Sequence, residues 1–202
     1  GGGGERVDVA LVDSVVASLE NLVTLYTVEG RIPGRTGNRY EFIYPYDAFR
    51  SSDGWMVIGA ANDDIWRRLC TVMGRPELAT DSRYESNEER VKRHGEVKEV
   101  VERWTRVRAS KEIVEILSAH DVPCSRVYTV KDVVEDPHIS RDRGMIVEVE
   151  DLEAGKMRLV ASPVKLSSKP LRVYSPSPRL GEHTVEVLRE IAESEDLLEV
   201  GE

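Results

Sequence analysis

The stretch from Arg35 to Trp66 constrains what this chain can fold into more than any other part of the sequence. It begins in a segment rich in glycine and proline, where the chain must turn several times. It continues into two short apolar runs separated by Ser52-Asp53-Gly54, and Asp-Gly between two such runs is a strong signal for a hairpin. The stretch therefore predicts the end of one structural unit, a linker, and the first hairpin of a second unit.

The second unit is predicted to be a small α+β domain over residues 46–127, because amphipathic segments follow the hairpin. Asn62 or Asp63 can cap the first of its helices, since both side chains accept hydrogen bonds from backbone amides. Gly74-Arg75-Pro76 ends that helix. The expected elements are strands at 48–50 and 55–59 and helices over 63–73, 86–107 and 111–119.

The residues before this domain predict part of a different layer. A short strand is expected at 6–11, followed by a helix over 14–27 that Asp13-Ser14 caps. One strand and one helix cannot bury both of their apolar faces. Residues 1–27 are therefore interpreted as the end of a larger α/β layer, and residues 28–45 as the linker that follows it.

Two further segments complete the predicted organisation, a second linker over 128–144 and a C-terminal unit over 145–202. The acidic end of the chain, from residue 193, is expected to fray. The elements expected in these segments are a helix at 130–135, hairpin strands at 145–150 and 156–161, an extended connector over 162–178 and a helix over 181–192.

Composition excludes several classes of function. The formal net charge of -9 argues against a nucleic-acid surface, which requires a basic face. No apolar run approaches the ~20 residues of a membrane span, and no leader suggests secretion, so a cytoplasmic protein is expected. Cys70 and Cys124 stand alone and are interpreted as buried thiols. No histidine has a second ligand at metal spacing, so no metal site is predicted.

A series of short motifs resembles the family III CoA-transferases, the group that includes carnitine and bile-acid CoA-transferases and α-methylacyl-CoA racemases. The resemblance begins at residues 4–13 and covers essentially the whole chain in the order of the family. Each motif is weak alone, but the joint order is specific. The later motifs are Arg35-x-Gly37-Asn38, Pro45-Tyr46-x-x-Phe49, Asp53-Gly54-Trp55-Met56-Val57-Ile58, Asn62-Asp63, Gly74-Arg75-Pro76-Glu77-Leu78, Asn87-x-x-Arg90, Val122-Pro123-Cys124, Asp136-Pro137-His138, Ser162-Pro163-Val164 and Leu180-Gly181-Glu182-His183-Thr184.

The resemblance implies a fold of the α/β plus α+β class. Such proteins have a large Rossmann-like domain, a small α+β domain and two linkers, and two chains thread through one another as an interlocked dimer. Residues 1–27 would close the first part of the large domain, 46–127 would be the small domain, and 145–202 would return to the large domain.

The resemblance also implies chemistry through an aspartate that forms covalent acyl and CoA-thioester intermediates. In the family this aspartate lies upstream of the glycines with which the chain begins. Asp13 aligns with a non-catalytic position and is interpreted as a helix cap. No catalytic residue is therefore assigned within these 202 residues, and no cofactor is expected beyond a CoA thioester as substrate.

Six residues are implied to line the substrate or CoA site. Gly37 and Asn38 fall on a mobile loop near the catalytic carboxylate, where the amide of Asn38 can bind an acyl oxygen, although an ordinary turn is an equal alternative. Asn62 and Asp63 would face the site from the small domain, or act only as helix caps. The others are Leu11, which would touch the CoA arm or pack in a core, and Tyr46, which could line an acyl pocket with Tyr40 and Tyr44 or serve in packing.

Three functions are compatible with these observations. The favoured one is the C-terminal portion of a CoA-transferase, inactive without an N-terminal segment or separate subunit that carries the aspartate. The second is an acyl-CoA racemase or isomerase on the same scaffold. Racemases of the family look to carry Glu at the position of Asn62, so the resemblance implies that Asn here favours transfer. The third is a non-catalytic interaction fragment. Acyl-CoA and a carboxylic acid are the expected substrates, with a homodimer or heteromer as the assembly and neither nucleic acid nor membrane as a partner.

Overall fold

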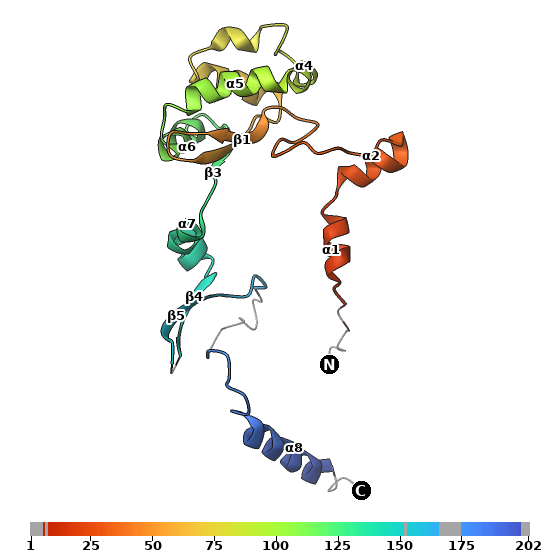
Figure 1. The fold of residues 1–202 in the computed structure, drawn as a ribbon, viewed down its shortest axis with the longest axis vertical. Coiled ribbons are helices and arrows are strands. Elements are labelled where there is room, and N and C mark those ends of the chain that lie inside the picture. The colour runs from red at the N-terminus through yellow and green to blue at the C-terminus, as the bar shows by residue number, and fades with distance from the viewer. Residues whose placement is uncertain (1–5, 7, 152, 166–174, 199–202) are drawn as a thin grey trace. The chain divides into compact units, whose positions relative to one another are not determined.

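The computed structural model describes residues 6, 8–151, 153–165 and 175–198. The chain divides into two compact units, residues 1–127 and residues 128–202 (Figure 1). The first unit holds a three-stranded sheet with helices, and the second holds a two-stranded hairpin with helices.

The sheet of the first unit is antiparallel, in the order β1 (Tyr46–Arg50), β2 (Trp55–Gly59) and β3 (Cys124–Arg126). Phe49 lies opposite Met56 in the register, and both are fully buried. Because successive side chains of a strand point to opposite faces, this pair and Ile58 define the core face of the sheet. The predicted hairpin is therefore confirmed, with β1 beginning two residues earlier than expected.

Helices supply the rest of the core of this unit. Buried Trp66 and Leu69 come from α3 (Asp63–Val72), and they join buried residues of the other helices in one hydrophobic cluster with the sheet. Burial of such side chains contributes about 1.5–3 kcal/mol each. The remaining helices are α4 (Asn87–Lys92), α5 (His94–Thr105) and α6 (Ser110–Ser118), with a short 3₁₀ turn at Pro76–Ala79.

The expectation of one long helix over 86–107 is wrong, because the helix breaks at Arg93. The backbone of Arg93 leaves helical geometry, with φ -107° and ψ 29°. The imidazole Nδ1 of His94 lies 3.2 Å from the carbonyl oxygen of Val91, near the end of α4. His94 is half-buried at this position. The break separates α4, which faces the linker, from α5, which contacts β1.

The expectations for the first 27 residues need correction. In the described part of this segment no strand forms, and the helix begins at Leu11 rather than at a cap on Asp13-Ser14. A strand needs a neighbour to satisfy its backbone groups, and the described residues offer none here. The helix is also divided, into α1 (Leu11–Ala17) and α2 (Asn21–Glu29), with Glu20 at a positive φ of 44° between them.

The two N-terminal helices expose most of their apolar side chains. Val16 of α1 is 52% exposed, α1 buries none of its residues, and α2 buries Leu25 alone. In the described part of the chain no single helix is long and apolar enough to cross a membrane, although α1 and α2, bent by 70°, meet that test together by length and composition.

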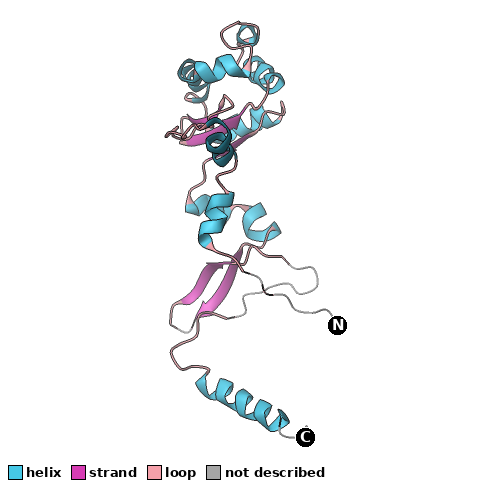
Figure 2. Ribbon diagram, turned by 90° about the vertical axis from the view of Figure 1, so that its right-hand side faces the viewer, coloured by secondary structure: helices cyan, strands magenta, loops and turns pink. Residues whose placement is uncertain are grey.

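The second unit begins with α7 (Val130–Glu135), where Thr129 and Asp132 form a reciprocal capping box. A π-helical turn over His138–Asp142 leads to the antiparallel hairpin of β4 (Ile146–Asp151) and β5 (Gly155–Val160) (Figure 2). Both the helix at 130–135 and this hairpin were predicted from the sequence.

The last helix, α8 (Thr184–Leu198), begins three residues later than expected and continues past Ala192. The expected fraying is therefore wrong for residues 193–198, while residues 199–202 lie outside the described part of the chain. Most of the connector predicted over 162–178 also lies outside it, since residues 166–174 are not described.

Candidate functional site

The residues predicted to line a site lie in the first unit, mostly where the linker meets β1 and α3. Gly37 adopts a positive φ of 69° in a turn, and open space surrounds the position where a side chain would begin. The turn therefore requires glycine for its backbone conformation rather than for close approach of another group. Asn38 is exposed beside it. Leu11 lies apart from them, at the start of α1, and is 89% exposed rather than packed in a core.

Tyr40 fixes the end of this turn at two points. Its backbone amide donates to the carbonyl oxygen of Tyr46 over 2.8 Å, and its hydroxyl accepts a hydrogen bond from Nδ2 of Asn21 over 3.0 Å. The rings of Tyr40 and Tyr46 lie 5.8 Å apart. The turn at Gly37 is therefore fastened both to the first strand of the sheet and to α2.

Tyr46, the first residue of β1, is more accessible than Tyr40 and Tyr44 of the linker. It is 45% exposed, and its ring lies over Gly59 so closely that a β-carbon there would come within 3.1 Å. Tyr44, in contrast, is fully buried and donates its hydroxyl hydrogen bond to Asp47 over 3.3 Å. Burial and the negative charge of Asp47 raise the pKa of Tyr44 well above its usual value. Tyr44 is a packing residue, while Tyr46 presents part of its ring to solvent.

Arg90 organises the junction between the linker and the small domain. Its guanidinium is fully buried, although arginine is almost never fully buried without partners. Nε donates to the carbonyl oxygen of Tyr44 over 2.8 Å, and Nη1 donates to the carbonyl oxygen of Tyr84 over 2.9 Å and to that of Glu85 over 3.2 Å. Nη2 donates to Oδ1 of Asp63 over 2.7 Å. One side chain thus joins three separate segments.

Asn87, one turn before Arg90 on α4, holds the same part of the linker. Its Oδ1 accepts from the backbone amide of Tyr44 over 3.0 Å, and its Nδ2 donates to the carbonyl oxygen of Phe42 over 2.8 Å. Because residues i and i+3 of a helix lie on one face, Asn87 and Arg90 together grip residues 42–44. We call this pair the linker clamp. Both residues belong to the sequence motif Asn87-x-x-Arg90, but no site role was predicted from that motif.

Asn62 and Asp63 stand at the start of α3. Asn62 is the N-cap, and its Oδ1 accepts from the backbone amide of Ile65 over 2.9 Å. Asp63 occupies the first helical position, where the helix dipole favours a carboxylate, and its side chain is 48% exposed while bound to Arg90. The capping role is therefore confirmed for Asn62. A role in binding substrate stays a prediction for both residues.

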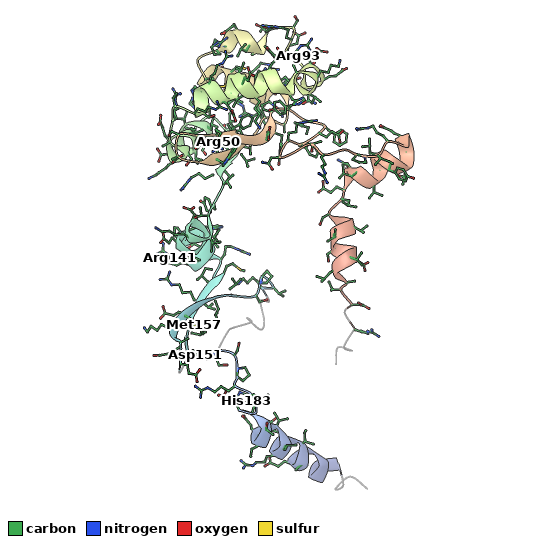
Figure 3. The ribbon with its side chains drawn as sticks, in the orientation of Figure 1. Arg50, Arg93, Arg141, Asp151, Met157 and His183 are labelled. Carbon is green, nitrogen blue, oxygen red and sulfur yellow. The ribbon has the colours of Figure 1, made fainter. Side chains whose placement is uncertain are left out.

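An open groove of about 540 Å³ borders the linker clamp. Arg39 and Phe42 line it from the linker, Asn87 and Val91 from α4, and His94 from the start of α5. Arg93, at the break between α4 and α5, is labelled in Figure 3. A volume of this size lies within the range of small-molecule sites. Of the residues predicted to bind substrate, Gly37 and Asn38 precede Arg39 directly in the chain.

Neither cysteine is suited to act as a nucleophile. Burial raises the pKa of Cys70 to about 12, and burial also raises the pKa of Cys124, so both thiols stay protonated at neutral pH. Among the residues that the structure describes, no three side chains of the metal-binding types come together.

Comparison with known proteins identifies the family. The family model of CoA-transferase family III matches residues 1–184. The chain is 33% identical to a succinate–glutarate CoA-transferase of Agrobacterium fabrum over 190 residues, which covers 94% of this chain and 47% of the relative. It is 35% identical to the β subunit of a succinyl-CoA–L-malate CoA-transferase of Chloroflexus aurantiacus over 194 residues, again 94% of this chain and 47% of the relative.

A solved structure agrees with this assignment. The crystal structure of a CaiB/BaiF family protein from Brucella suis superimposes with a TM-score of 0.75 at 30% identity, over 93% of this chain and 48% of the other. The chain thus spans about half the length of the relatives it matches. It belongs to CoA-transferase family III and corresponds to the C-terminal part of its members.

Proposed function

We propose that this chain is the C-terminal portion of a CoA-transferase that moves CoA from an acyl-CoA donor to a dicarboxylic acid. The observation that carries the proposal is the match over 94% of the chain to enzymes named for succinate, glutarate and malate. The cytoplasmic location and the assembly as a homodimer or heteromer, both expected from the sequence, remain parts of this proposal.

The reaction that the family resemblance implies runs through an aspartate supplied from outside these 202 residues. Its carboxylate attacks the acyl carbon of the donor thioester, so a mixed anhydride forms and CoA leaves as a thiolate. The thiolate then attacks the aspartyl carbonyl, which releases the donor acid and leaves an aspartyl-CoA thioester. The acceptor acid repeats the two steps in reverse order, so acyl-CoA product forms and the aspartate is regenerated. No cofactor beyond CoA itself is required by this sequence of steps.

This chain would contribute the surroundings of the reacting carbonyl. We place the turn of Gly37 and Asn38 beside it, where the amide of Asn38 can donate to an acyl oxygen. Tyr46 and the start of α3 with Asn62 and Asp63 would form the wall from the small domain. The linker clamp supports this arrangement, because Arg90 binds both the residue before Pro45 and Asp63. Leu11 would touch the CoA arm, as its exposure permits.

The apolar side chains on α1 and α2 support an assembly with a further segment. Val12, Val15 and Val16 are each more than half exposed, and contiguous exposed apolar surface usually marks a contact with another chain or segment. The relatives are about twice as long as this chain. We therefore propose that the segment carrying the aspartate covers these helices. The combination of this chain with that segment is called the complete transferase below.

A direct test compares the chain alone with the complete transferase. Both are incubated with succinyl-CoA and glutarate, and glutaryl-CoA is measured by mass spectrometry. The complete transferase is expected to form glutaryl-CoA, and the chain alone is expected to form none. CoA transfer by the isolated chain would overturn the claim that the nucleophile lies elsewhere.

The same experiment separates the alternative functions. A racemase of this scaffold would exchange the α-proton of a 2-methylacyl-CoA for deuterium without moving CoA to another acid. A non-catalytic fragment would show neither reaction even when combined with the segment proposed to carry the aspartate. Deuterium exchange without glutaryl-CoA formation would replace the proposed transferase by the racemase.

A further inference from the structure

Arg39 differs from the other cations of the groove at the linker clamp. Arg31 and Lys92 also line that groove, but Arg31 pairs with Glu41 over 2.5 Å and Lys92 pairs with Glu88 over 2.7 Å. Within the described ranges of the chain, Arg39 makes neither a side-chain hydrogen bond nor an ion pair. Among the residues that the structure describes, no carboxylate therefore pairs with the guanidinium of Arg39 in this groove.

The surroundings of Arg39 make this lack of a partner informative. The residue is half-buried, and it lines both the groove at α4 and a second cavity of about 210 Å³ beside Asn21 and Tyr40. Its positive charge also acts on Tyr44, where it opposes the rise of the pKa that burial causes. A partly buried charge without a counter-ion is costly, and an anionic ligand removes that cost.

The position of Arg39 is fixed by the residues around it. The turn at Gly37 precedes it, and Tyr40, which follows it, is bound to both Tyr46 and Asn21. A cation on a fastened turn loses less conformational entropy on binding than one on a free surface segment. Arg39 is therefore prepared for a ligand that reaches the groove from the side of the turn.

We propose that Arg39 binds the remote carboxylate of a dicarboxylic acid substrate, that is, the carboxylate that does not become the CoA thioester. The inference rests on the proposed function and names the residue that selects its substrate class. A planar guanidinium matches a carboxylate with two parallel hydrogen bonds. Asn38, the preceding residue, is the group proposed to bind the acyl oxygen, so one turn would hold both ends of the acid.

The test uses the complete transferase with succinyl-CoA as donor and two acceptors of similar length. Glutarate carries the remote carboxylate, and butyrate lacks it. Arg39→Gln is expected to lower kcat/KM for glutarate by about tenfold to a hundredfold, mainly through KM, because a charge-assisted hydrogen bond is lost. The kcat/KM for butyrate is expected to stay within about twofold. Arg39→Lys should recover part of the loss, since the charge remains but the fork does not.

The control variant is Arg103→Gln, which removes one positive charge from an exposed site on α5 outside the groove. It is expected to leave the preference for glutarate over butyrate unchanged. An equal loss for both acceptors in Arg39→Gln would show that Arg39 only holds the turn, and no loss for either would show that it is uninvolved. Either result overturns the inference while the proposed function stands.

A binding measurement separates failure of this inference from failure of the proposed function. Glutarate is titrated calorimetrically into the wild type and into Arg39→Gln, without any acyl-CoA. Binding that depends on Arg39 in a protein that transfers no CoA would overturn the proposed function and leave Arg39 as a dicarboxylate-binding residue without a role in CoA transfer. Equal binding of glutarate by both proteins would overturn the inference regardless of activity.

Discussion

At the scale of single residues, Arg90 shows how a buried charge can be retained. It is fully buried, yet three backbone carbonyls and the carboxylate of Asp63 satisfy its donors. Removing the cation costs more free energy than the intact hydrogen bonds contribute, because the acceptors are left buried and unpaired. Its value lies in joining the linker to α3 rather than in strong net attraction.

Replacing Arg90 tests this role. Arg90→Leu is expected to lower the free energy of unfolding by about 3 kcal/mol or more, since several buried carbonyls lose their partner. Urea unfolding followed by tryptophan fluorescence measures the change. Arg93→Leu is the matched control, because the side chain of Arg93 is half-exposed and forms an ion pair with Glu89, and the change should cost under about 1 kcal/mol. Equal losses for the two variants would contradict the role assigned to Arg90.

Two neighbouring sites differ in how far their roles follow from the sequence, the cap at Asn62 and the linker clamp. Asn62 as a cap follows from its own chemistry and from the apolar spacing after it, so the structure confirms it. The linker clamp could not be predicted from such local features, because Arg90, followed by Val91 on an amphipathic segment, has the pattern of a charged surface. Its burial depends on carbonyls contributed by residues 42–44 and 84–85, and local patterns carry no information about such tertiary partners.

At the scale of elements, the turn of the first hairpin is held against the start of α6. Asp53 accepts from the backbone amide of Ser110 over 2.8 Å, from its hydroxyl over 3.1 Å and from the hydroxyl of Ser51 over 2.8 Å. The backbone amide of Ser52 donates to the carbonyl oxygen of Arg108 over 2.9 Å. Asp53 thus does more than permit a turn, which is the role that the sequence indicated.

The charge of Asp53 should make this contact depend on pH. The hydrogen bond from the Ser110 amide and the one from Ser51 hold the pKa of Asp53 below its usual value. Because the folded pKa is lowered, the charged form stabilises the protein above the unfolded pKa of about 3.9, and this contribution is lost as the pH falls through the folded pKa. Asp53→Asn should therefore be less stable than the wild type near pH 7.

Urea unfolding of the wild type and Asp53→Asn between pH 7 and pH 3 measures this dependence. The difference between the two should be constant above about pH 5 and shrink below about pH 4. Asp64→Asn, at an exposed site on α3, is the control. A difference for Asp53→Asn that does not change with pH would contradict a role for its charge.

Helices and strands could be predicted where a local sequence pattern specifies them. The two hairpins, α3 and α7 follow from alternation, caps and turn residues. The break at Arg93 and the division of α1 from α2 do not, because both depend on conformations that helical periodicity does not encode. The strand expected at 6–11 was wrong because alternation alone cannot form a strand without a partner.

At the scale of the whole molecule, the chain carries the family match but spans about half of its relatives. Its first unit has its own core, while α1 buries nothing within the described residues. The sequence predicted that residues 1–27 belong to a larger layer, because one strand and one helix could not bury their own apolar faces. The proposal that a further segment covers α1 rests on the greater length of the relatives, since nothing in the composition specifies it.

Introducing a charged side chain on α1 tests the proposal that another segment covers this helix. Val16→Asp places a carboxylate on α1 at a residue that is 52% exposed. It should change the stability of the chain alone by no more than about 0.5 kcal/mol, because the site is exposed, and it should weaken assembly and activity of the complete transferase. Val107→Asp, exposed near the end of α5, is the control. Full activity and assembly of Val16→Asp would contradict the covering of this face.

The most direct test of the central claim is to locate the covalent intermediate. The complete transferase is mixed with succinyl-CoA alone, quenched, and mapped by peptide mass spectrometry for a CoA thioester. We expect an aspartyl-CoA thioester on a peptide outside these 202 residues. A CoA adduct on an aspartate of this chain, such as Asp13, or turnover to glutaryl-CoA without any aspartyl adduct, would contradict it.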